Sequence, residues 1–346
     1  VEVDATGRQG RTLRYPAPVL AVPGSELRMT IDLDLQQTCE KLLKDWKGSI
    51  IVMDPANGDI LAMTSQPGYD PNWFSSGMTP EQWGSINNNP KKPLLNRAIQ
   101  FQEPPGSVFK VVTSMAGFRS NSVTEETQFF CNSRFKYSKH VFRCWNKHGH
   151  GMMDLPHALE GSCNVFYYQL GVKIGIDMIA QTAWHFGLGQ KTGVRLPNEK
   201  TGLMPNREWK KKRYNEEWWP GETISVSIGQ GGVTTTPLQL GCLMAMTANR
   251  GTMYRPRLIR EVIGPTSRES SVMDPEVIHS LDVPDNYWDT LIDGLQLVVH
   301  GKKGTARKMK MREMTAAGKT GTAQVISSKA LKKMGYESEE ETPQKY

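Results

Sequence analysis

The sequence predicts a mixed α+β (α/β) fold, in which most helices lie between a β-hairpin near the start and a strand near the end. The hairpin is expected at residues 48–64, because two apolar runs flank the turn signal Pro55-Ala56-Asn57-Gly58-Asp59. The late strand is expected at residues 315–325. Between them apolar residues recur at helical spacing, and no internal repeat is found. This order favours a sheet closed by N-terminal and C-terminal elements.

Local patterns place the other elements. Residues 1–30 are rich in Gly and Pro with short extended runs, and we expect them to end an accessory β-rich module. Apolar periodicity predicts helices at 32–43, 108–116, 155–160, 165–170, 178–186, 238–248 and 287–299. A further strand is expected at 254–262, and irregular or loop-rich segments at 65–97, 127–154 and 187–221.

The composition is that of a globular protein, with 38% hydrophobic and 22% charged residues among 346. The net charge is +7, and the densest basic cluster is Lys210-Lys211-Lys212-Arg213. Such a cluster fits a solvated face, or a surface for an anionic polymer or membrane headgroups. No nucleic-acid reader module accompanies it.

The start of the chain carries no targeting signal. No apolar run approaches the roughly 20 residues that cross a bilayer, and the first residues do not form a signal peptide. The first residues, Val1-Glu2-Val3-Asp4, look like the interior of a domain. We therefore expect a soluble portion of a longer protein.

A candidate nucleophile lies in the segment 103–110. Two prolines and Gly106 precede a helix-compatible run, which places Ser107 in its first turn and Lys110 on the same face. A serine beside a lysine at the start of a buried helix is the pair that an activated nucleophile needs, because a desolvated lysine can lose its proton and act as base. Alone, S-x-x-K recurs by chance in many chains.

Two further motifs follow the S-x-x-K motif along the chain. Ser162-Cys163-Asn164 precedes a predicted helix, and Lys319-Thr320-Gly321-Thr322 lies in the predicted late strand. Each has an ordinary interpretation, since S-x-N is a common helix cap and K-T-G also occurs at Lys191-Thr192-Gly193, which we assign to a turn. The succession S-x-x-K, S-x-N and K-[ST]-G, however, is the signature set of penicillin-recognising acyl-serine enzymes.

The chain resembles the class B penicillin-binding proteins, which are peptidoglycan D,D-transpeptidases. The similarity extends over residues 30–326. It includes these patterns outside the three motifs: Asp54-Pro55, Gly58-Asp59-Ile60-Leu61-Ala62-Met63, Tyr69-Asp70-Pro71-Asn72, Asn96-Arg97-Ala98, Phe186-Gly187-Leu188-Gly189, Ile228-Gly229-Gln230-Gly231, Thr236-Pro237-Leu238-Gln239 and Gly304-Thr305-Ala306. Segments 149–151 and 204–210 look most like the elongation-type member rather than the division-type member.

The resemblance implies a penicillin-recognising transpeptidase fold, with an antiparallel sheet flanked by helices and an all-helical subdomain. Residues 1–30 would then end the N-terminal pedestal, and residues 31–346 would form the transpeptidase domain without its last strands and closing helix. It also implies a location on the periplasmic face of the bacterial inner membrane. The implied partners are peptidoglycan stem peptides, β-lactam antibiotics, a membrane glycosyltransferase and scaffold proteins of the elongation complex.

The resemblance also implies roles for the motif residues. Ser107 would attack the penultimate D-Ala of a stem peptide, Lys110 would act as base and Ser162 would relay the proton to the leaving amine. Asn164 would hold Lys110 and the substrate amide, while Lys319 would add positive potential.

The remaining substrate-binding residues implied are Thr320, Gly321 and Thr322. The two threonines would bind the terminal carboxylate, and the backbone N–H groups of Ser107 and Thr322 would form the oxyanion hole. No cofactor is expected for the reaction itself. β-Lactams, which mimic the D-Ala-D-Ala end, would trap the nucleophile.

The five cysteines raise a separate question. Cys39 and Cys242 lie in predicted helices and are expected to be buried free thiols. Three thiols and an imidazole can form a closed zinc set, although the spacing here is not that of a zinc finger. The resemblance implies a structural Zn²⁺ that fixes the loop around Ser162 and Asn164, with the ligands Cys131, Cys144, His150 and Cys163. The alternatives are a Cys131–Cys144 disulfide or free buried thiols, and His140 or His148 in place of His150.

Three rival functions remain open from the sequence. A β-lactam sensor domain shares two of the motifs but signals instead of cross-linking. A serine β-lactamase shares the chemistry but releases its acyl group quickly. An inactive scaffold is disfavoured by the intact motifs.

Overall fold

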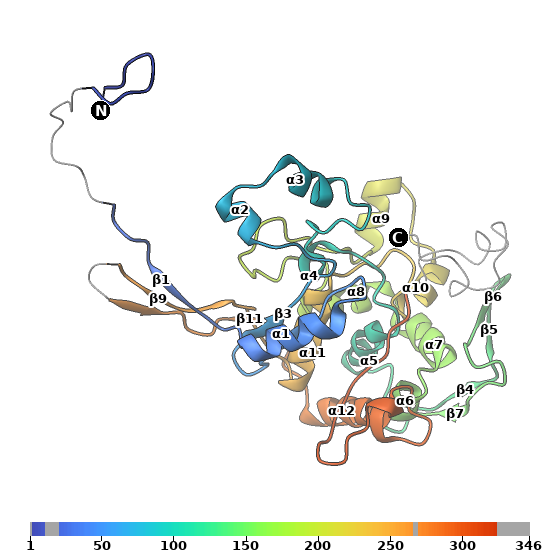
Figure 1. The fold of residues 1–346 in the computed structure, drawn as a ribbon. Coiled ribbons are helices and arrows are strands. Elements are labelled where there is room, and N and C mark those ends of the chain that lie inside the picture. The colour runs from blue at the N-terminus through green and yellow to red at the C-terminus, as the bar shows by residue number, and fades with distance from the viewer. Residues whose placement is uncertain (1, 11–20, 266–268, 324–346) are drawn as a thin grey trace. The chain divides into compact units, whose positions relative to one another are not determined.

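The computed structural model describes residues 2–10, 21–265 and 269–323 (Figure 1). The chain divides into two compact units. The smaller unit combines the N-terminal segment up to Met29 with Ile259–Asp274, and the larger unit contains residues 30–258 and the chain from Pro275 onward. The first segment of the smaller unit ends at Met29, while its second segment lies within the predicted domain 31–346, so the two-domain division at residue 30 stays a prediction.

The smaller unit is built on a three-stranded antiparallel sheet in the order β1-β9-β10. The strands are β1 (Glu26–Met29), β9 (Ile259–Ile263) and β10 (Ser270–Val272). Glu26 pairs with Ile263, so residues more than 200 positions apart form one ladder. The single strand predicted at 254–262 is therefore wrong. Pro256 cannot donate to a ladder, and it separates β8 (Thr252–Tyr254) from β9.

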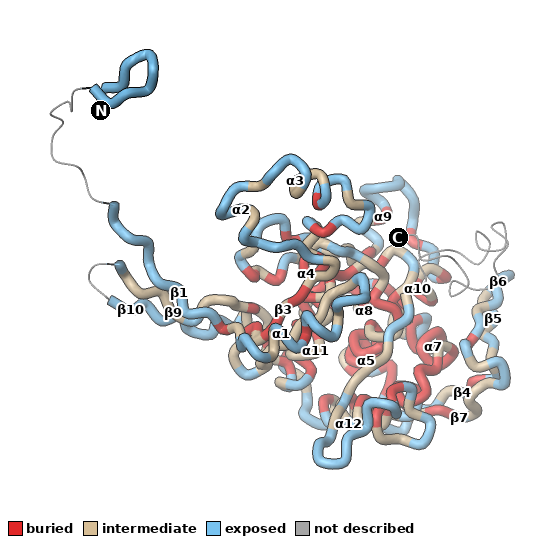
Figure 2. The backbone as a smooth tube through the Cα atoms, viewed as in Figure 1, coloured by how far each residue is buried: buried red, intermediate tan, exposed pale blue. Residues whose placement is uncertain are grey.

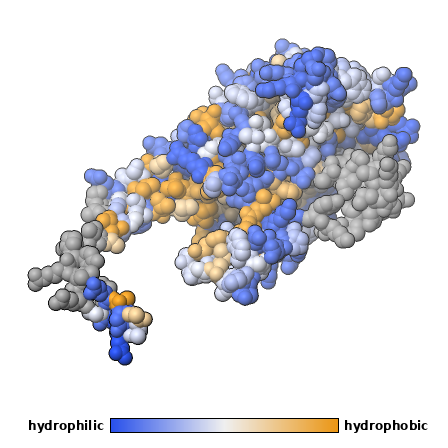
Figure 3. All heavy atoms as spheres, turned by 90° about the horizontal axis from the view of Figure 1, so that it is seen from above, coloured by the Kyte–Doolittle hydropathy of each residue, from blue (hydrophilic) through white to orange (hydrophobic). Residues whose placement is uncertain are grey.

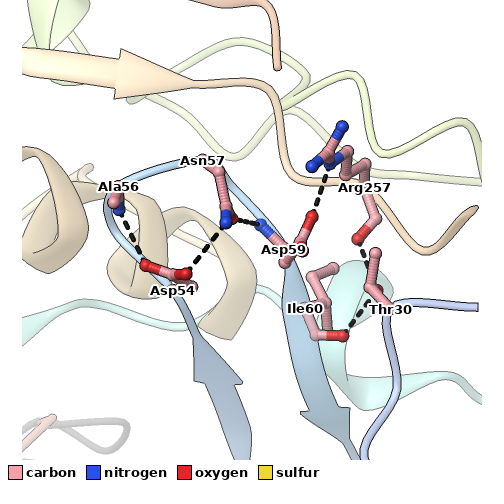
Figure 4. A network of polar contacts seen from close by, with 7 residues as sticks. All are labelled: Thr30, Asp54, Ala56, Asn57, Asp59, Ile60 and Arg257. Atoms are coloured by element: carbon pink, nitrogen blue, oxygen red, sulfur yellow. Dashed lines mark hydrogen bonds and ion pairs between the residues drawn. The ribbon is translucent and has the colours of Figure 1, made fainter. Parts of the chain in front are cut away.

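The predicted hairpin is present in the larger unit as β2 (Ile51–Met53) paired with β3 (Ile60–Met63). Figure 4 shows how polar side chains hold its turn. Asp54 accepts bonds from the Ala56 amide and the Asn57 side chain at 2.9 Å each, and Asn57 in turn accepts the Asp59 amide at 2.7 Å. Asp59 is 1% exposed and is paired with Arg257, so the end of the turn is anchored to a distant segment.

The core of the larger unit is helical. Helix α5 (Lys110–Arg119) is buried from its first residue to Phe118, and Figure 2 shows the buried residues gathered around it and its neighbours. The predicted helices are confirmed as α1 (Leu33–Leu43), α6 (Leu155–Glu160), α7 (Asn164–Ile174), α8 (Ile176–His185), α11 (Pro237–Ala248) and α12 (Asp285–His300). Each large apolar side chain buried here contributes about 1.5–3 kcal/mol, which makes α5 a rigid platform.

Three segments expected to be irregular contain regular structure. Residues 65–100 include α2 (Asn72–Ser76), α3 (Pro80–Asn87) and α4 (Arg97–Gln100). Residues 127–154 form two antiparallel pairs, β4 (Phe129–Cys131) with β7 (Gly151–Met153) and β5 (Arg134–Tyr137) with β6 (His140–Arg143). Residues 187–226 contain α9 (Arg207–Tyr214) and α10 (Pro220–Val226). These elements are too short or too polar to produce apolar periodicity.

The late strand is the main correction. Residues 315–323 include no strand, and residues 324–325 lie outside the described part of the chain. The backbone bonds of this segment run to α12: Gly318 N donates to Leu295 O, and Ala316 N donates to the His300 ring, each at 3.0 Å. The mixed α/β prediction is confirmed. Within the described residues, however, the strands form five small sheets rather than one large sheet. The sheet not yet described pairs β8 with β11 (Val277–Ser280).

Apolar side chains on the surface are dispersed. Figure 3 shows them on one face in separate patches among hydrophilic residues. Among the described residues, no helix has the length and apolar character needed to cross a membrane.

Candidate active site

The predicted nucleophile lies where a short 3₁₀ helix, η1 (Gly106–Phe109), leads into α5. Ser107 is half-buried, whereas Lys110, the first residue of α5, is fully buried. Gly106 has φ +54°, and a Cβ there would lie 2.4 Å from the carbonyl oxygen of Thr322. A glycine is therefore needed at position 106 for the K-T-G segment to approach the serine.

Lys110 joins the first predicted motif to the second. Its Nζ donates to Oδ1 of Asn164 at 2.7 Å, to the Ser162 carbonyl at 2.8 Å and to Ser162 Oγ at 3.1 Å. The ammonium also lies 5.3 Å from the ring centroid of Tyr167, a buried residue of α7. Four groups thus fix this amine at the start of α5, in the residue three positions after Ser107.

The third motif, which comes later in the chain, contacts Ser162 of the second motif. Lys319 Nζ donates to Ser162 Oγ at 3.0 Å, so this hydroxyl lies between two lysines. Neighbouring contacts hold the segment: Thr320 Oγ1 lies 2.9 Å from Thr305 Oγ1, and the Gln230 side chain donates to the Thr322 carbonyl at 3.2 Å. The three motifs, far apart in sequence, meet at one place.

Burial sets the charge state of the two lysines. Desolvation, followed by the positive charge of Lys319, holds the pKa of Lys110 well below its usual range. Burial lowers the pKa of Lys319 to about 8. Lys110 therefore releases its proton more readily than an exposed lysine, while Lys319 keeps its charge up to about pH 8. An amine that accepts a proton beside a serine, with a second cation nearby, can support nucleophilic acyl transfer.

The predicted cysteine and histidine cluster is also assembled. The four ligand atoms lie within 4.8 Å of one another; they belong to Cys131, Cys144, His150 and Cys163. Nδ1 of His150 lies 3.6 Å from Sγ of Cys131 and 3.5 Å from Sγ of Cys144. In a tetrahedral zinc site, bond lengths of about 2.0–2.3 Å place neighbouring donors roughly 3.5–3.8 Å apart. The donor types and spacing therefore fit zinc.

Two of the alternatives left open by the sequence, the disulfide and the other histidines, can be compared with the structure. All cysteines of the cluster are free thiols in the described structure, so the Cys131–Cys144 disulfide is not formed. His140 and His148 are exposed and lie outside the cluster. A hydrogen bond from Cys163 lowers the pKa of the Cys144 thiol, and a thiolate is the form that binds a metal.

Other predictions about the motifs are also tested by the geometry. The second K-T-G copy lies in a loop without strand flanks, and the backbone N–H of Thr192 donates to the Glu199 carboxylate at 2.7 Å. Sequence reasoning assigned no role to Thr305 or Gln230, although both belong to the family patterns quoted above. It also missed Trp145, whose indole N–H donates to the carbonyls of Gly161 and Ser162. No sequence motif marks that contact.

Comparison with known proteins identifies the class to which this fold and site belong. Residues 48–339 match the family model described as the penicillin binding protein transpeptidase domain. The chain belongs to this family.

Individual relatives are similar over most of this chain. It is 35% identical to peptidoglycan D,D-transpeptidase MrdA of Escherichia coli (strain K12) over 332 aligned residues. These residues are 95% of this chain and 52% of the relative. The identity to MrdA of Acinetobacter baumannii is 38% over 330 residues, or 94% of this chain and 48% of the relative. The chain thus spans about half the length of these curated relatives.

Solved structures show the same fold. The Pseudomonas aeruginosa PBP2 structure in complex with WCK 5153 superposes with a TM-score of 0.81 at 36% identity, covering 88% of this chain and 69% of that chain. The structure of a complex between PBP2 and MreC from Helicobacter pylori gives a TM-score of 0.79 at 32% identity, covering 94% of this chain and 59% of that one.

Proposed function

We propose that this chain is the transpeptidase part of an elongation-type penicillin-binding protein, which cross-links peptidoglycan stem peptides and is inhibited covalently by β-lactams. The observation that carries the proposal is the convergence on Ser162: its Oγ accepts bonds from Lys110 at 3.1 Å and from Lys319 at 3.0 Å. The names of the relatives, peptidoglycan D,D-transpeptidase MrdA and PBP2, support the choice of reaction and substrate.

In the proposed first half-reaction, Ser107 Oγ attacks the carbonyl of the penultimate D-Ala, and neutral Lys110 takes the hydroxyl proton. The tetrahedral intermediate then collapses. The bond to the terminal D-Ala breaks, and Ser162 passes a proton from Lys110 to the leaving amine. Asn164 holds Lys110 through the 2.7 Å contact at its Oδ1. The products are free D-Ala and an acyl-enzyme on Ser107.

The K-T-G segment would bind the substrate. Lys319 supplies positive potential, and the hydroxyls of Thr320 and Thr322 bind the terminal carboxylate. The backbone N–H groups of Ser107 and Thr322 would receive the developing oxyanion, with about 3–4 kcal/mol of transition-state stabilisation per donor. The close approach of Thr322 to Gly106 supports this pairing. An amine of a neighbouring stem peptide then attacks the ester and releases Ser107.

Labelling with a fluorescent penicillin tests the function. We expect a covalent adduct on Ser107, located by mass spectrometry, that persists for many minutes, together with release of D-Ala from a D-Ala-D-Ala peptide. Ser107→Ala should not label, whereas the control Ser114→Ala should still label. Rapid loss of the adduct would instead indicate a β-lactamase, and labelling without D-Ala release would indicate a sensor domain. An adduct that forms on Ser107→Ala refutes the mechanism.

We also propose that the Cys131, Cys144, His150 and Cys163 cluster holds a structural Zn²⁺. The donor spacing and the three free thiols support this choice. Bound there, zinc would cross-link β4, the loop between β6 and β7, and the residue before α7, and so brace the segment that carries Ser162. We expect about one equivalent of zinc in purified protein, less than half in His150→Ala and an unchanged content in His148→Ala. Less than half an equivalent in the unmodified protein contradicts the site.

The proposed setting is the periplasmic face of the bacterial inner membrane, where peptidoglycan is cross-linked. The H. pylori complex with MreC and a solved structure of a peptidoglycan synthase complex support partners of two kinds. These are a scaffold protein of the elongation complex and a membrane glycosyltransferase. Co-purification of this chain, within its full-length protein, with such partners would test the assignment.

A further inference from the structure

Trp145 has an unusual environment for an exposed side chain. It is 59% exposed, yet its indole N–H points inward and donates to Gly161 O at 3.0 Å and to Ser162 O at 3.1 Å. Buried indole N–H groups usually find a protein partner, whereas an exposed indole can use water. The Trp145 ring stays largely in solvent while its N–H donates to two successive carbonyls. The position of this side chain is therefore explained by the hydrogen bonds and not by burial of the ring.

The two carbonyls belong to a strained segment. Ser162 has φ +49°, in the left-handed region that non-glycine residues seldom adopt. Such a conformation persists only where surrounding contacts fix it. The Ser162 carbonyl receives two donors, Lys110 Nζ at 2.8 Å and Trp145 Nε1 at 3.1 Å. Together they use both acceptor positions of this oxygen and hold the peptide group that sets the direction of Ser162 Oγ.

The opposite side of the indole is fixed as well. Its ring packs edge-on against the His150 ring, with centroids 5.4 Å apart and planes at 67°. The neighbouring residue Cys144 is a member of the cysteine and histidine cluster. Trp145 is thus held by the cluster on one side and bonded to the Ser162 segment on the other.

We propose that Trp145 is a positioning residue, which fixes the Ser162 backbone through its indole N–H and so keeps Ser162 Oγ between Lys110 and Lys319. This inference rests on the proposed acyl-transfer function and deepens it. In this role Trp145 touches no reacting atom. Its loss should therefore slow the chemical step, which depends on the Ser162 hydroxyl, and leave the initial non-covalent affinity unchanged.

Stopped-flow acylation with a chromogenic or fluorescent penicillin separates the two quantities. In Trp145→Phe, which keeps an aromatic ring but has no N–H donor, we expect the acylation rate constant to fall about ten-fold. The non-covalent dissociation constant should stay within two-fold and the zinc content should be unchanged. The matched control is Trp184→Phe, another exposed tryptophan (54%) on α8, which should acylate like the unmodified protein.

A second variant covers the case in which phenylalanine disturbs the fold. Replacing Trp145 with β-(3-benzothienyl)alanine keeps the shape of the bicyclic ring and exchanges the N–H for sulfur, and the same ten-fold loss is expected. Unchanged acylation in that variant overturns the proposal, as does a loss that follows a fall in zinc content. Failure of the unmodified protein to acylate at all would instead refute the proposed function before Trp145 is tested.

Discussion

Lys319 Nζ donates a 3.0 Å hydrogen bond to Oγ of Ser162, a residue 157 positions earlier in the chain. The same hydroxyl accepts a bond from Lys110 at 3.1 Å. Burial lowers the pKa of both amines, and the positive charge of Lys319 lowers the pKa of Lys110 further. The hydroxyl of Ser162 therefore lies between two lysines that release their protons more readily than exposed lysines do.

This charge pattern predicts a pH dependence. The pKa of Lys319 is lowered to about 8, so its positive charge is present below that pH and is lost above it. The second-order rate constant of penicillin acylation should fall on the alkaline side with a midpoint near pH 8. In Lys319→Arg the guanidinium stays charged, and this alkaline fall should be absent up to about pH 10 even if the maximum rate is lower. An identical alkaline fall in both proteins would contradict the assignment.

The contact between Lys110 and Asn164 predicts the effect of one added charge. In Asn164→Asp a carboxylate replaces the amide oxygen 2.7 Å from the ammonium, and an opposite charge at that distance raises the pKa of Lys110. At pH 7 the lysine then stays protonated and cannot accept the proton of Ser107. We expect the acylation rate at pH 7 to fall by at least about 100-fold. The acid limb of the profile of acylation rate against pH should move to higher pH.

Asn164→Ala is the matched comparison for that change. It also removes the amide but adds no charge, so its acylation should be slower without an upward shift of the acid side. Rate–pH profiles of the two variants measure the difference. Equal shifts in both would show that the charge state of Lys110 does not limit the reaction.

The sequence predicted the elements whose signals are local. Helix α11 was predicted almost residue for residue because apolar residues recur along it at helical spacing. The structure adds that Thr236 and Gln239 form a capping box at its start. Helix α9 was missed because its sequence, from Arg207 to Tyr214, is charged on most sides. The ladder between Glu26 and Ile263 was out of reach for another reason, since it depends on tertiary contacts between distant segments.

The same distinction applies to the site. Ser107, Lys110, Ser162, Asn164 and Lys319 were predicted as site residues because their motifs occur in a fixed order. Hydrogen bonds bring the last four together, and their catalytic roles stay predictions. The contacts of Trp145 with the Ser162 segment arise from the way the loop after β6 folds back. Nothing in the local sequence around a lone tryptophan marks such a contact.

The approach of Gly106 to the K-T-G segment predicts a steric effect. A Cβ at Gly106 would lie 2.4 Å from the Thr322 carbonyl oxygen, and φ is +54°, so Gly106→Ala must displace backbone as well as strain it. We expect at least a 100-fold loss of penicillin acylation. Gly77→Ala is the control: φ is +86° there, but nothing lies within 4 Å of the added Cβ. It should lose some stability yet acylate normally, and equal acylation in both variants would refute the steric account.

The ion pair between Asp59 and Arg257 predicts a loss of stability rather than of chemistry. Figure 4 shows the two side chains facing each other. The Asp59 side chain is 1% exposed and that of Arg257 is 16% exposed. Asp59→Asn removes the buried carboxylate that faces this guanidinium, and we expect a loss of about 3 kcal/mol in the free energy of unfolding. Asp289→Asn breaks a surface pair with Arg250, whose side chains are 55% and 46% exposed, and should cost no more than about 1 kcal/mol. Denaturant titration of the two variants measures the difference, and similar losses in both would show that burial does not determine the strength of the Asp59–Arg257 pair.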